Sequence, residues 1–416
     1  MTAGTVTADT QHVVWLAATP WDGIPGTDVA MATAMTRYAR ILWVDPPLSL
    51  ISPARRRREG GGGIVPSLSA VGDNITRLAT VALPGLTRPG VRATTAPLLR
   101  AQVRWALRRT GVRPSAVVAG HLEDVLGRWG AAVNVLYCTD DYVAGAELMG
   151  LSPRRLRAQE QQALARADAV AVISPALADH WSSLGADPLV IPNGCHPTPE
   201  PVQAARAAAA DWPGPVVGLV GQLSERIDLG ILTALADAGY SLLIVGPHDP
   251  RWEPQRFAAL TARPNVRYAG RVPAEAVPSY LAAIDVGITP YTSSPFNLAS
   301  FPLKTLEYLS AGRPVVSTDL PGSRWLLDDL SRADQAPDQI MTLASTPADV
   351  VVAVRRMAGG PGDPARADPD AATGRPEPPR GDRCRAFAAR HSWDRRADAL
   401  ADAMGFSPLK IRRMAG

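Results

Sequence analysis

The amino-acid sequence predicts an α/β protein with two domains, each built on a parallel sheet. The chain has 416 residues, which is too long for one ordinary hydrophobic core and favours two domains of roughly 200 residues each. Short apolar runs alternate with stretches that can form helices, as in a doubly wound parallel sheet. Hydrophobic residues make up 46% of the chain, which excludes a disordered protein.

The first half of the chain follows an order of strand, loop, helix and strand. An apolar run at 12–18 is followed by a loop at 19–27 and a helical stretch that ends at Arg40. The loop contains glycines but lacks the GxGxxG fingerprint, so the sequence does not indicate a dinucleotide site there. Further buried strands are expected at 41–45, 116–119, 134–137, 169–173 and 189–191.

Residues 301–318 place a lysine and a glutamate on the same face of one helix. Pro302 opens the expected helix, and Gly312 is a good left-handed cap that ends it before a buried parallel strand. Lys304 and Glu307 are three residues apart and are therefore neighbours. Lysine occurs only at positions 304 and 410 among 43 basic residues, so Lys304 is not background usage. A cation and a carboxylate near a helix N-terminus suit a pyrophosphate next to a ribose diol, and an ordinary surface ion pair is the alternative.

This segment resembles the donor-binding motif of glycosyltransferases with the GT-B fold, in particular the family 4 group (glycosyl transferases group 1). The motif is carried here by Pro302, Lys304, Glu307, Gly312, Pro314, Val315 and Val316. Residues 216–226 resemble the first strand and basic loop of the same domain, and 387–397 resemble its terminal helix. The later strands of that domain then fall at 240–247, 265–272 and 284–290.

The resemblance implies a GT-B architecture, with two Rossmann-like domains facing across a cleft and a C-terminal helix that crosses back to the N-terminal domain. An Ala-rich, Pro-flanked stretch at 198–215 is the expected hinge. The expected parts are an acceptor-binding domain at 1–198, a linker at 199–214, a nucleotide-sugar-binding domain at 215–388, and the crossing helix and tail at 389–416.

The activity that the resemblance implies is metal-independent transfer of a sugar, of the hexosyltransferase kind, from a nucleotide diphosphate sugar to an acceptor hydroxyl. Arg226 and Lys304 are the expected clamps on the diphosphate, near Gly221, and Glu307 is expected to bind the ribose hydroxyls. The nucleotide sugar is a co-substrate, and no cofactor or metal is expected.

The chain departs from the family pattern at Ala299, where family members often carry a glutamate that contacts the donor sugar. Asn297 and Ser300 are then left to hold the sugar. This departure leaves open a non-catalytic sugar-nucleotide-binding protein. A sugar-nucleotide epimerase, an enzyme class with the same fold, is a second alternative.

Candidates for acceptor binding and for the catalytic base lie in the N-terminal domain. In GT-B enzymes the first loop reaches into the cleft. The candidates for contact with the acceptor are therefore Trp21, Asp22, Gly23 and Gly26. Asp140 and Asp141 follow a strand at the end that faces the ligand crevice, so each is a candidate base or a helix cap. His121 follows the strand at 116–119 and is a second candidate base, with a cap or surface role as the alternative.

Positive charge is concentrated in residues 51–115, which contain twelve arginines against two acidic residues. Such a segment predicts contact with an anionic membrane surface, and a solvated basic face is the alternative. Nucleic acid is disfavoured because no aromatic-interleaved RNA motif or helix-turn-helix pattern occurs. The expected acceptor is a lipid-linked or cell-envelope glycan, as in polysaccharide biosynthesis, or a small molecule.

The cysteines at 138, 195 and 384 have neither paired nor CxxC spacing, so neither a disulfide framework nor a zinc site is indicated. No apolar stretch is long enough for a secretion signal or a membrane span. A cytoplasmic enzyme is therefore expected, with peripheral attachment to the inner face of the membrane.

Overall fold

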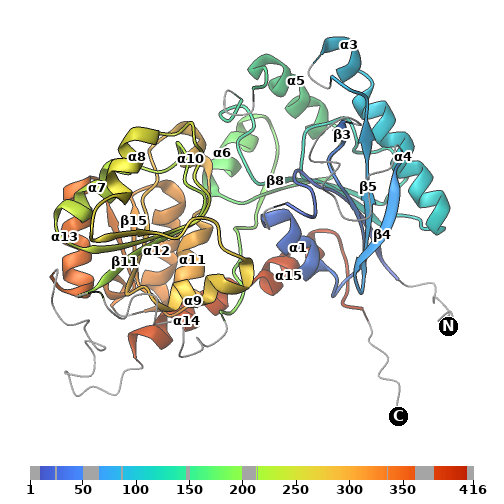
Figure 1. Ribbon diagram of the computed structural model, residues 1–416. Coiled ribbons are helices and arrows are strands. Elements are labelled where there is room, and N and C mark those ends of the chain that lie inside the picture. The colour runs from blue at the N-terminus through green and yellow to red at the C-terminus, as the bar shows by residue number, and fades with distance from the viewer. Residues whose placement is uncertain are drawn as a thin grey trace. The chain divides into compact units, whose positions relative to one another are not determined.

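The structure is a computed structural model that describes residues 10–23, 26–49, 65–85, 88–146, 150–198, 212, 214–334, 336–360 and 379–409. The chain divides into two compact units (Figure 1). Unit 1 comprises Met1–Pro192 and Trp393–Gly416, and unit 2 comprises Asn193–Ser392. The predicted boundaries at 198 and 389 differ from these by a few residues, and the predicted linker lies almost wholly outside the described residues.

Unit 1 has, in its described part, a sheet of eight strands in the order β10-β9-β8-β7-β1-β2-β5-β4. All neighbours in this sheet are parallel except β4 and β5, which form an antiparallel edge. A short parallel pair, β3 with β6, lies beside it. The strands are β1 (His12–Leu16), β2 (Arg40–Val44), β3 (Leu48–Ser49), β4 (Ser67–Gly72), β5 (Ile75–Ala79), β6 (Val81–Ala82), β7 (Ala116–Ala119), β8 (Val133–Cys138), β9 (Ala169–Val172) and β10 (Leu189–Val190).

The helices of unit 1 lie on both faces of this sheet (Figure 1). Covering both faces explains why the central strands are continuous apolar runs and why Trp15, Trp43 and Trp181 are fully buried. The helices are α1 (Thr27–Met35), α3 (Pro89–Arg92), α4 (Thr95–Thr110), α5 (Pro153–Leu164), α6 (Pro175–Ser183) and α15 (Trp393–Ala403).

Unit 2 is a parallel sheet with the order β13-β12-β11-β14-β15-β16 among its described residues. Its strands are β11 (Val216–Val220), β12 (Ser241–Val245), β13 (Val266–Tyr268), β14 (Val286–Thr289), β15 (Val315–Thr318) and β16 (Met341–Ala344). Its helices are α7 (Leu229–Asp237), α8 (Pro254–Thr261), α9 (Val277–Ala282), α10 (Pro295–Ala299), α11 (Leu303–Ser310), α12 (Pro321–Ala333), α13 (Pro347–Ala358) and α14 (Arg380–Arg390), with short 3-10 turns at Ala274–Ala276 and Pro337–Gln339.

The strands expected from apolar runs are present in both units, and their ends differ from the prediction by at most four residues. The prediction of one terminal helix at 387–397 is wrong, because α14 and α15 are separate helices. The backbone leaves the helix where the His391 carbonyl accepts a hydrogen bond from the Cys195 N–H (2.9 Å) and Ser392 forms a β-bridge with Cys195.

The helix α15 belongs to unit 1, as expected for a C-terminal helix that returns to the first domain. It packs against α1, and Asp398 accepts hydrogen bonds from Tyr38 (2.5 Å) and Arg37 (3.2 Å) there. None of the described helices is long and apolar enough to cross a membrane.

Candidate functional site

The helix α11 carries the Lys304–Glu307 pair and is fixed in unit 2 by buried polar contacts. It follows Pro302 and is succeeded by Gly312, whose φ of 74° is the left-handed conformation predicted for the cap. The Tyr308 hydroxyl accepts a hydrogen bond from the Val220 N–H at the end of β11 (2.7 Å). This contact anchors the motif beside the carboxyl ends of the strands, where parallel sheets bind ligands.

Lys304 and Glu307 form an ion pair, with 2.7 Å between Nζ and Oε2. Both side chains keep about a third of their surface exposed, 30% and 29%, so a ligand can reach them. Burial lowers the pKa of Lys304, but the adjacent Glu307 carboxylate outweighs this effect and holds the pKa above its usual value. The ammonium is therefore charged at neutral pH and available to an anion.

Arg226 lies in the loop after β11, and its guanidinium is held by aromatic rings and hydrogen bonds. Its Cζ lies 4.8 Å from the ring centre of Phe296 and 5.5 Å from that of Tyr291. Tyr291 also interacts electrostatically with Lys304 and Glu307. Tyr291 thus links the three charged residues that the sequence assigned to the donor.

Asn297 and Ser300 contact Arg226 in this structure. The Arg226 Nε donates to Asn297 Oδ1 (2.8 Å), and its Nη2 donates to Ser300 Oγ (3.2 Å). The Asn297 amide also donates to the Arg226 carbonyl and to Thr292, and Asn297 is only 1% exposed. Because its hydrogen-bonding groups are engaged within the protein, Asn297 does not have the sugar-binding position we expected, and it orients Arg226 instead.

Gly221 lies directly beneath Lys304 and close to a second glycine. A Cβ at Gly221 would lie 3.5 Å from the Lys304 side chain, and one at Gly246 would collide with the Gly221 carbonyl. Gly246 has a φ of 137°, which other residues rarely adopt. A small cavity borders the same region and is lined by Tyr291, Asn297, Ser300, Phe301, Pro302, Leu320 and Ser323.

The first loop of unit 1, with its acceptor candidates, is tied to the sheet by Arg77. Arg77 forms two parallel hydrogen bonds with Asp22 (2.8 and 2.7 Å) and a third with the buried Asp45 (2.8 Å). Burial lowers the pKa of Arg77, but the two carboxylates outweigh this effect and raise it. Asp22 is thus engaged in an ion pair, and buried Arg77 is not part of a basic surface as its place in 51–115 suggested.

The other acceptor candidates lie along the same loop. The Trp21 N–H donates to Asp45 (2.8 Å), and the Trp21 ring packs edge-on against Trp43. The Gly23 N–H donates to the Pro20 carbonyl (2.9 Å), and Gly26 is the N-cap of α1. The loop therefore has a fixed backbone on which Trp21 remains only partly buried.

The candidate bases occupy two neighbouring loops of unit 1. His121 Nδ1 accepts the Glu123 N–H (3.3 Å), and burial lowers the pKa of the imidazole. The neutral ring then carries its proton on Nε2 and presents a donor, which does not suit a base. Asp141 caps the following turn through the Ala144 N–H (2.8 Å), which is the cap role expected as the alternative, and Asp140 accepts a hydrogen bond from the hydroxyl of neighbouring Thr139 (3.2 Å). Both aspartates stay candidate bases.

A buried carboxyl that the sequence analysis missed lies next to these loops. Asp28, in the first turn of α1, is 4% exposed, and its Oδ2 accepts the Ala18 N–H (2.9 Å). Burial raises the pKa of Asp28 to about 7, helped by the negative charge of Asp140. The available signal was an acidic residue directly after the Gly26-Thr27 helix start, but its burial depends on the tertiary fold.

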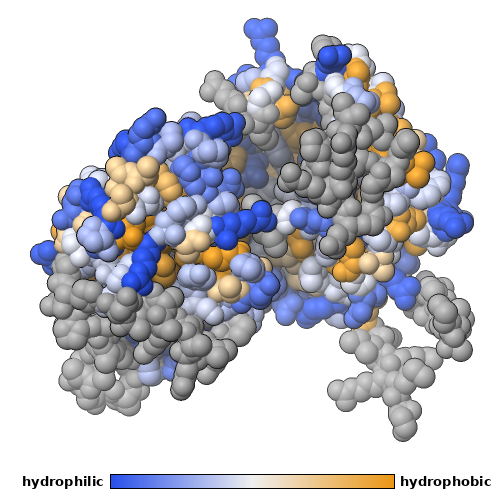
Figure 2. Space-filling view, viewed as in Figure 1, coloured by the Kyte–Doolittle hydropathy of each residue, from blue (hydrophilic) through white to orange (hydrophobic). Residues whose placement is uncertain are grey.

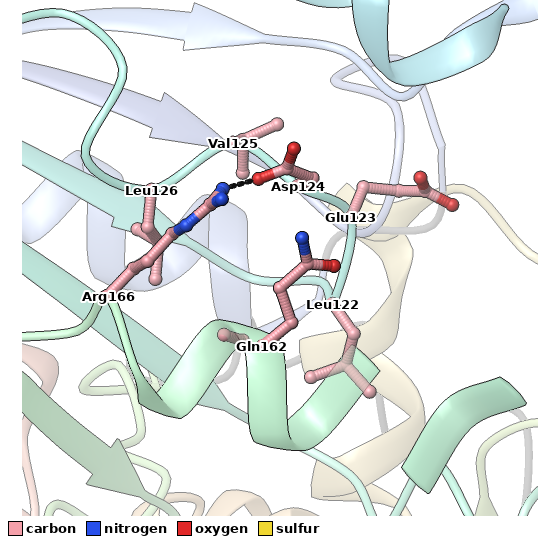
Figure 3. Close-up of a pocket in the computed structure, with 8 residues that line it drawn as sticks. Leu122, Glu123, Asp124, Val125, Leu126, Gln162 and Arg166 are labelled. Atoms are coloured by element: carbon pink, nitrogen blue, oxygen red, sulfur yellow. Dashed lines mark ion pairs between the residues drawn. The ribbon is translucent and has the colours of Figure 1, made fainter. Parts of the chain in front are cut away.

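A separate pocket in unit 1 contains a charged cluster centred on Asp124 (Figure 3). Asp124 pairs with Arg100 of α4 (2.6 Å), with Arg128, and with Arg166, which reaches it from beyond the end of α5. This cluster contains none of the residues that the sequence analysis proposed. It joins two helices to the segment that follows His121 and so fixes one of the candidate loops.

Part of the chain is similar in sequence to known glycosyltransferases. Residues 214–357 match the model of the family described as glycosyl transferases group 1. A relative described as a putative teichuronic acid biosynthesis glycosyltransferase, TuaH, from Bacillus subtilis (strain 168) is 39% identical over 112 residues. That match covers 26% of this chain and 28% of the relative, so the chain matches little more than a quarter of that protein.

Solved structures of low sequence identity share the fold of nearly the whole chain. Sucrose-phosphate synthase from Thermosynechococcus elongatus has a TM-score of 0.68 at 16% identity, covering 94% of this chain and 98% of that one. Anabaena Alr3699/HepE in complex with UDP and glucose has a TM-score of 0.64 at 15% identity, covering 94% and 99%. WaaG, a glycosyltransferase involved in lipopolysaccharide biosynthesis, has a TM-score of 0.60 at 14% identity, covering 94% and 99%.

The family match spans every donor candidate that the sequence motif identified, from Gly221 to Glu307. The structural matches extend over both units. The chain therefore has the GT-B fold, and its residues 214–357 match the glycosyl transferases group 1 family.

Proposed function

We propose that this protein is a glycosyltransferase that moves a sugar from a nucleotide diphosphate sugar to an acceptor hydroxyl. The observation that carries the proposal is the grouping of Arg226, Lys304 and Glu307 around Tyr291 beside the end of β11. Two cations and one carboxylate in this arrangement match a diphosphate next to a ribose diol.

The proposed mechanism rests on electrostatic stabilisation of the departing nucleoside diphosphate. Negative charge grows on the diphosphate as the bond to the sugar breaks, and fixed cations stabilise it most when they need no rearrangement. Arg226 is already fixed by Asn297, Ser300 and two aromatic rings. Lys304 is fixed by its ion pair with Glu307, whose side chain is 29% exposed and which we assign to the ribose hydroxyls. We assign charge neutralisation to the two cations.

We further propose that the donor is a sugar linked to UDP or to another nucleoside diphosphate. Among the similar structures, Anabaena HepE is described in complex with UDP-glucose, and starch synthase IV from Arabidopsis thaliana is described with ADP and acarbose. These descriptions support the nucleotide class, and they leave the base and the sugar to be determined by binding experiments.

The proposed acceptor is a cell-envelope or lipid-linked glycan. Teichuronic acid biosynthesis, in the description of the TuaH relative, supports this class. A cytoplasmic location remains part of the proposal, and it suits the buried residues Cys138, Cys195 and Cys384, which form no disulfide in the described part of the chain.

We also propose that unit 1 meets an anionic membrane through α4. One face of α4 is buried, and the opposite face exposes Trp105 (41%) among Arg104, Arg108 and Arg109. Figure 2 shows apolar and hydrophilic residues side by side over the part of unit 1 where α4 runs. An aromatic ring flanked by arginines suits the headgroup region of a bilayer. Residues 50–64, with four of the arginines behind this prediction, lie outside the described residues.

Co-sedimentation with vesicles tests the membrane proposal. Wild type should sediment with anionic vesicles at low salt and stay in solution with neutral ones, because each arginine near the headgroups contributes about 1 kcal/mol. Substitution of Arg104 and Arg108 should abolish sedimentation with anionic vesicles. Substitution of the exposed Arg355 and Arg356 on α13 is the matched control and should leave sedimentation unchanged. Equal loss in both variants would attribute binding to overall charge and contradict a role for α4.

Nucleotide release tests the transferase proposal against its two alternatives. Incubation with a panel of nucleotide sugars and bacterial envelope glycans should release nucleoside diphosphate only when donor and acceptor are both present. Conversion of one nucleotide sugar into another without acceptor would indicate an epimerase. Donor binding without release under any acceptor would favour a non-catalytic binding protein.

A further inference from the structure

The Asp28 carboxyl occupies a closely fitted and nearly sealed position in unit 1. One oxygen, Oδ2, accepts the Ala18 N–H at 2.9 Å. The other, Oδ1, is also buried, and the nearby Trp15 indole interacts with the carboxyl and lowers the pKa of Asp28 against the larger effect of burial. The Tyr137 hydroxyl is buried and also interacts with Asp28. A carboxyl enclosed in this way is destabilised when it carries a charge.

Gly120 provides the space for this carboxyl. A Cβ at position 120 would lie 3.1 Å from Oδ2, 3.2 Å from Oδ1 and 3.3 Å from the Ala18 nitrogen. Its φ lies outside the left-handed region, so glycine is favoured here because a Cβ would crowd the carboxyl, and not because of the backbone conformation. The Gly120 carbonyl accepts a hydrogen bond from the Tyr142 hydroxyl (2.5 Å).

These contacts bring together the three loops that carry the acceptor-side candidates. Ala18 opens the loop that contains Trp21 and Asp22, and Gly120 directly precedes His121. Tyr142 directly follows Asp140 and Asp141. The Asp28 carboxyl is therefore packed at the point where the three loops meet.

The groups that face Asp28 favour its uncharged form. Burial is the largest influence, and Asp140, at the end of β8, adds a negative charge that acts in the same direction. The Ala18 N–H and the nearby Trp15 indole oppose these effects. Tyr137 of β8 and Tyr142 face the carboxyl without a charge at neutral pH, because burial raises the pKa of both phenols. Arg396 of α15 also interacts electrostatically with Tyr137.

We propose that Asp28 is a positioning residue that, as an uncharged carboxylic acid, holds the three acceptor-side loops together and leaves the negative charge at that edge to Asp140. This inference rests on the proposed transferase function, in which Asp140 is a candidate base. Two carboxyl groups with environments that separate their ionisation commonly divide acid and base roles in this way. Ionisation of Asp28 would place a second negative charge in the core next to Asp140 and loosen the loops.

Hydrogen–deuterium exchange of the full-length protein at pH 6 and pH 8, corrected for the intrinsic rate, tests the proposal without an acceptor. In wild type, protection in loops 18–23, 120–123 and 139–146 should fall about tenfold, because the protonated fraction of a group with a pKa near 7 falls by about that factor. Asp28→Asn can still accept the Ala18 N–H and cannot ionise, so its protection should not change with pH. Peptides at 221–228 in unit 2 are the internal control and should behave alike in both proteins.

Three results would overturn the proposal. Equal pH responses in wild type and Asp28→Asn would show that another group controls the loops. Lower protection in Asp28→Asn at both pH values would show a merely structural contact. Once a donor and acceptor are identified, nucleotide release should fall about tenfold from pH 6 to pH 8 in wild type only, and an unchanged wild-type rate would contradict a role in the reaction.

The proposal and the transferase function can fail separately. A protein that binds no nucleotide but shows the predicted exchange pattern would contradict the function and leave the behaviour of Asp28 intact. If the protein binds and turns over nucleotide sugar but Asp28→Asn does not change the pH response, the proposed function stands and the role of Asp28 is contradicted.

Discussion

Asn297 and Ser300 are the residues whose predicted roles changed most between sequence and structure, because both contact Arg226. Asn297 and Ser300 were expected to contact sugar, yet both donate or accept within the protein to orient the guanidinium. The motif spacing predicted that these residues are near the donor. Only the folded geometry distinguishes a side chain that binds a ligand from one that orients the side chain that binds it.

Asn297→Ala should weaken nucleotide binding through Arg226 alone. Losing a hydrogen bond to a charged group corresponds to about 1.5–3 kcal/mol, so we expect a tenfold or greater rise in the dissociation constant. Isothermal titration with the preferred nucleoside diphosphate measures this, with Arg226→Ala as the reference. The double variant should bind no more weakly than Arg226→Ala, and additive losses would contradict an action through Arg226.

Asp28 should make the stability of the protein depend on pH. Its pKa is about 7 in the folded state and near 3.8 in the unfolded state, so its full stabilising contribution exists below about pH 4. That contribution decreases as the pH rises from about 4 to about 7, because the unfolded state releases its proton first. Above pH 7 the free energy of unfolding no longer changes through Asp28. The total change is about 4 kcal/mol at roughly 1.4 kcal/mol per unit.

Urea unfolding of wild type and Asp28→Asn at pH 5 and pH 8 checks this dependence. The stability advantage of Asp28→Asn over wild type should grow by about 2–3 kcal/mol between the two pH values, because the two remaining units of the pKa difference lie in that range. A constant difference would mean that Asp28 ionises normally in the folded protein.

At the scale of single elements, the sequence predicted α11 and most strands correctly because local signals mark them. Pro302 and Gly312 bound α11, and continuous apolar runs mark strands that are covered on both faces. The β4–β5 hairpin escaped prediction because β4 is half-buried or exposed along its length and carries no apolar run. The break between α14 and α15 contains neither proline nor glycine, and it depends on a contact with Cys195, nearly 200 residues earlier.

The position of α11 depends on the Tyr308 hydroxyl. Tyr308→Phe leaves the Val220 N–H buried without its partner, so unit 2 should lose about 1–3 kcal/mol of stability. Because Lys304 and Glu307 lie on the same helix, nucleotide binding should weaken as well. Chemical unfolding and titration together check this, and a destabilised variant with unchanged affinity would show that the helix keeps its position without the bond.

At the scale of the whole molecule, the sequence predicted the fold class and the candidate donor residues, whereas it did not predict the polar core of unit 1. Arg226, Lys304 and Glu307 lie within one recognisable domain. Asp22 and Arg77 are 55 positions apart in the sequence, and Asp28 and Gly120 are 92 positions apart. Local sequence patterns do not predict contacts over such separations. The charge count placed Arg77 on a basic surface, although folding buries it between two aspartates.

The central claim is that unit 2 binds a nucleoside diphosphate through Arg226, Lys304 and Glu307. A thermal-shift screen of wild type, Lys304→Ala and Glu307→Ala against UDP, GDP, ADP and TDP and their sugars tests it directly, with Asp28→Asn as a control outside this site. Ligand at 100 times its dissociation constant should stabilise wild type and the control by about 2.7 kcal/mol. We predict that one nucleotide does so and that both donor-site variants lose the effect. Folded wild type that responds to none of them, or variants that respond as wild type does, would contradict the claim.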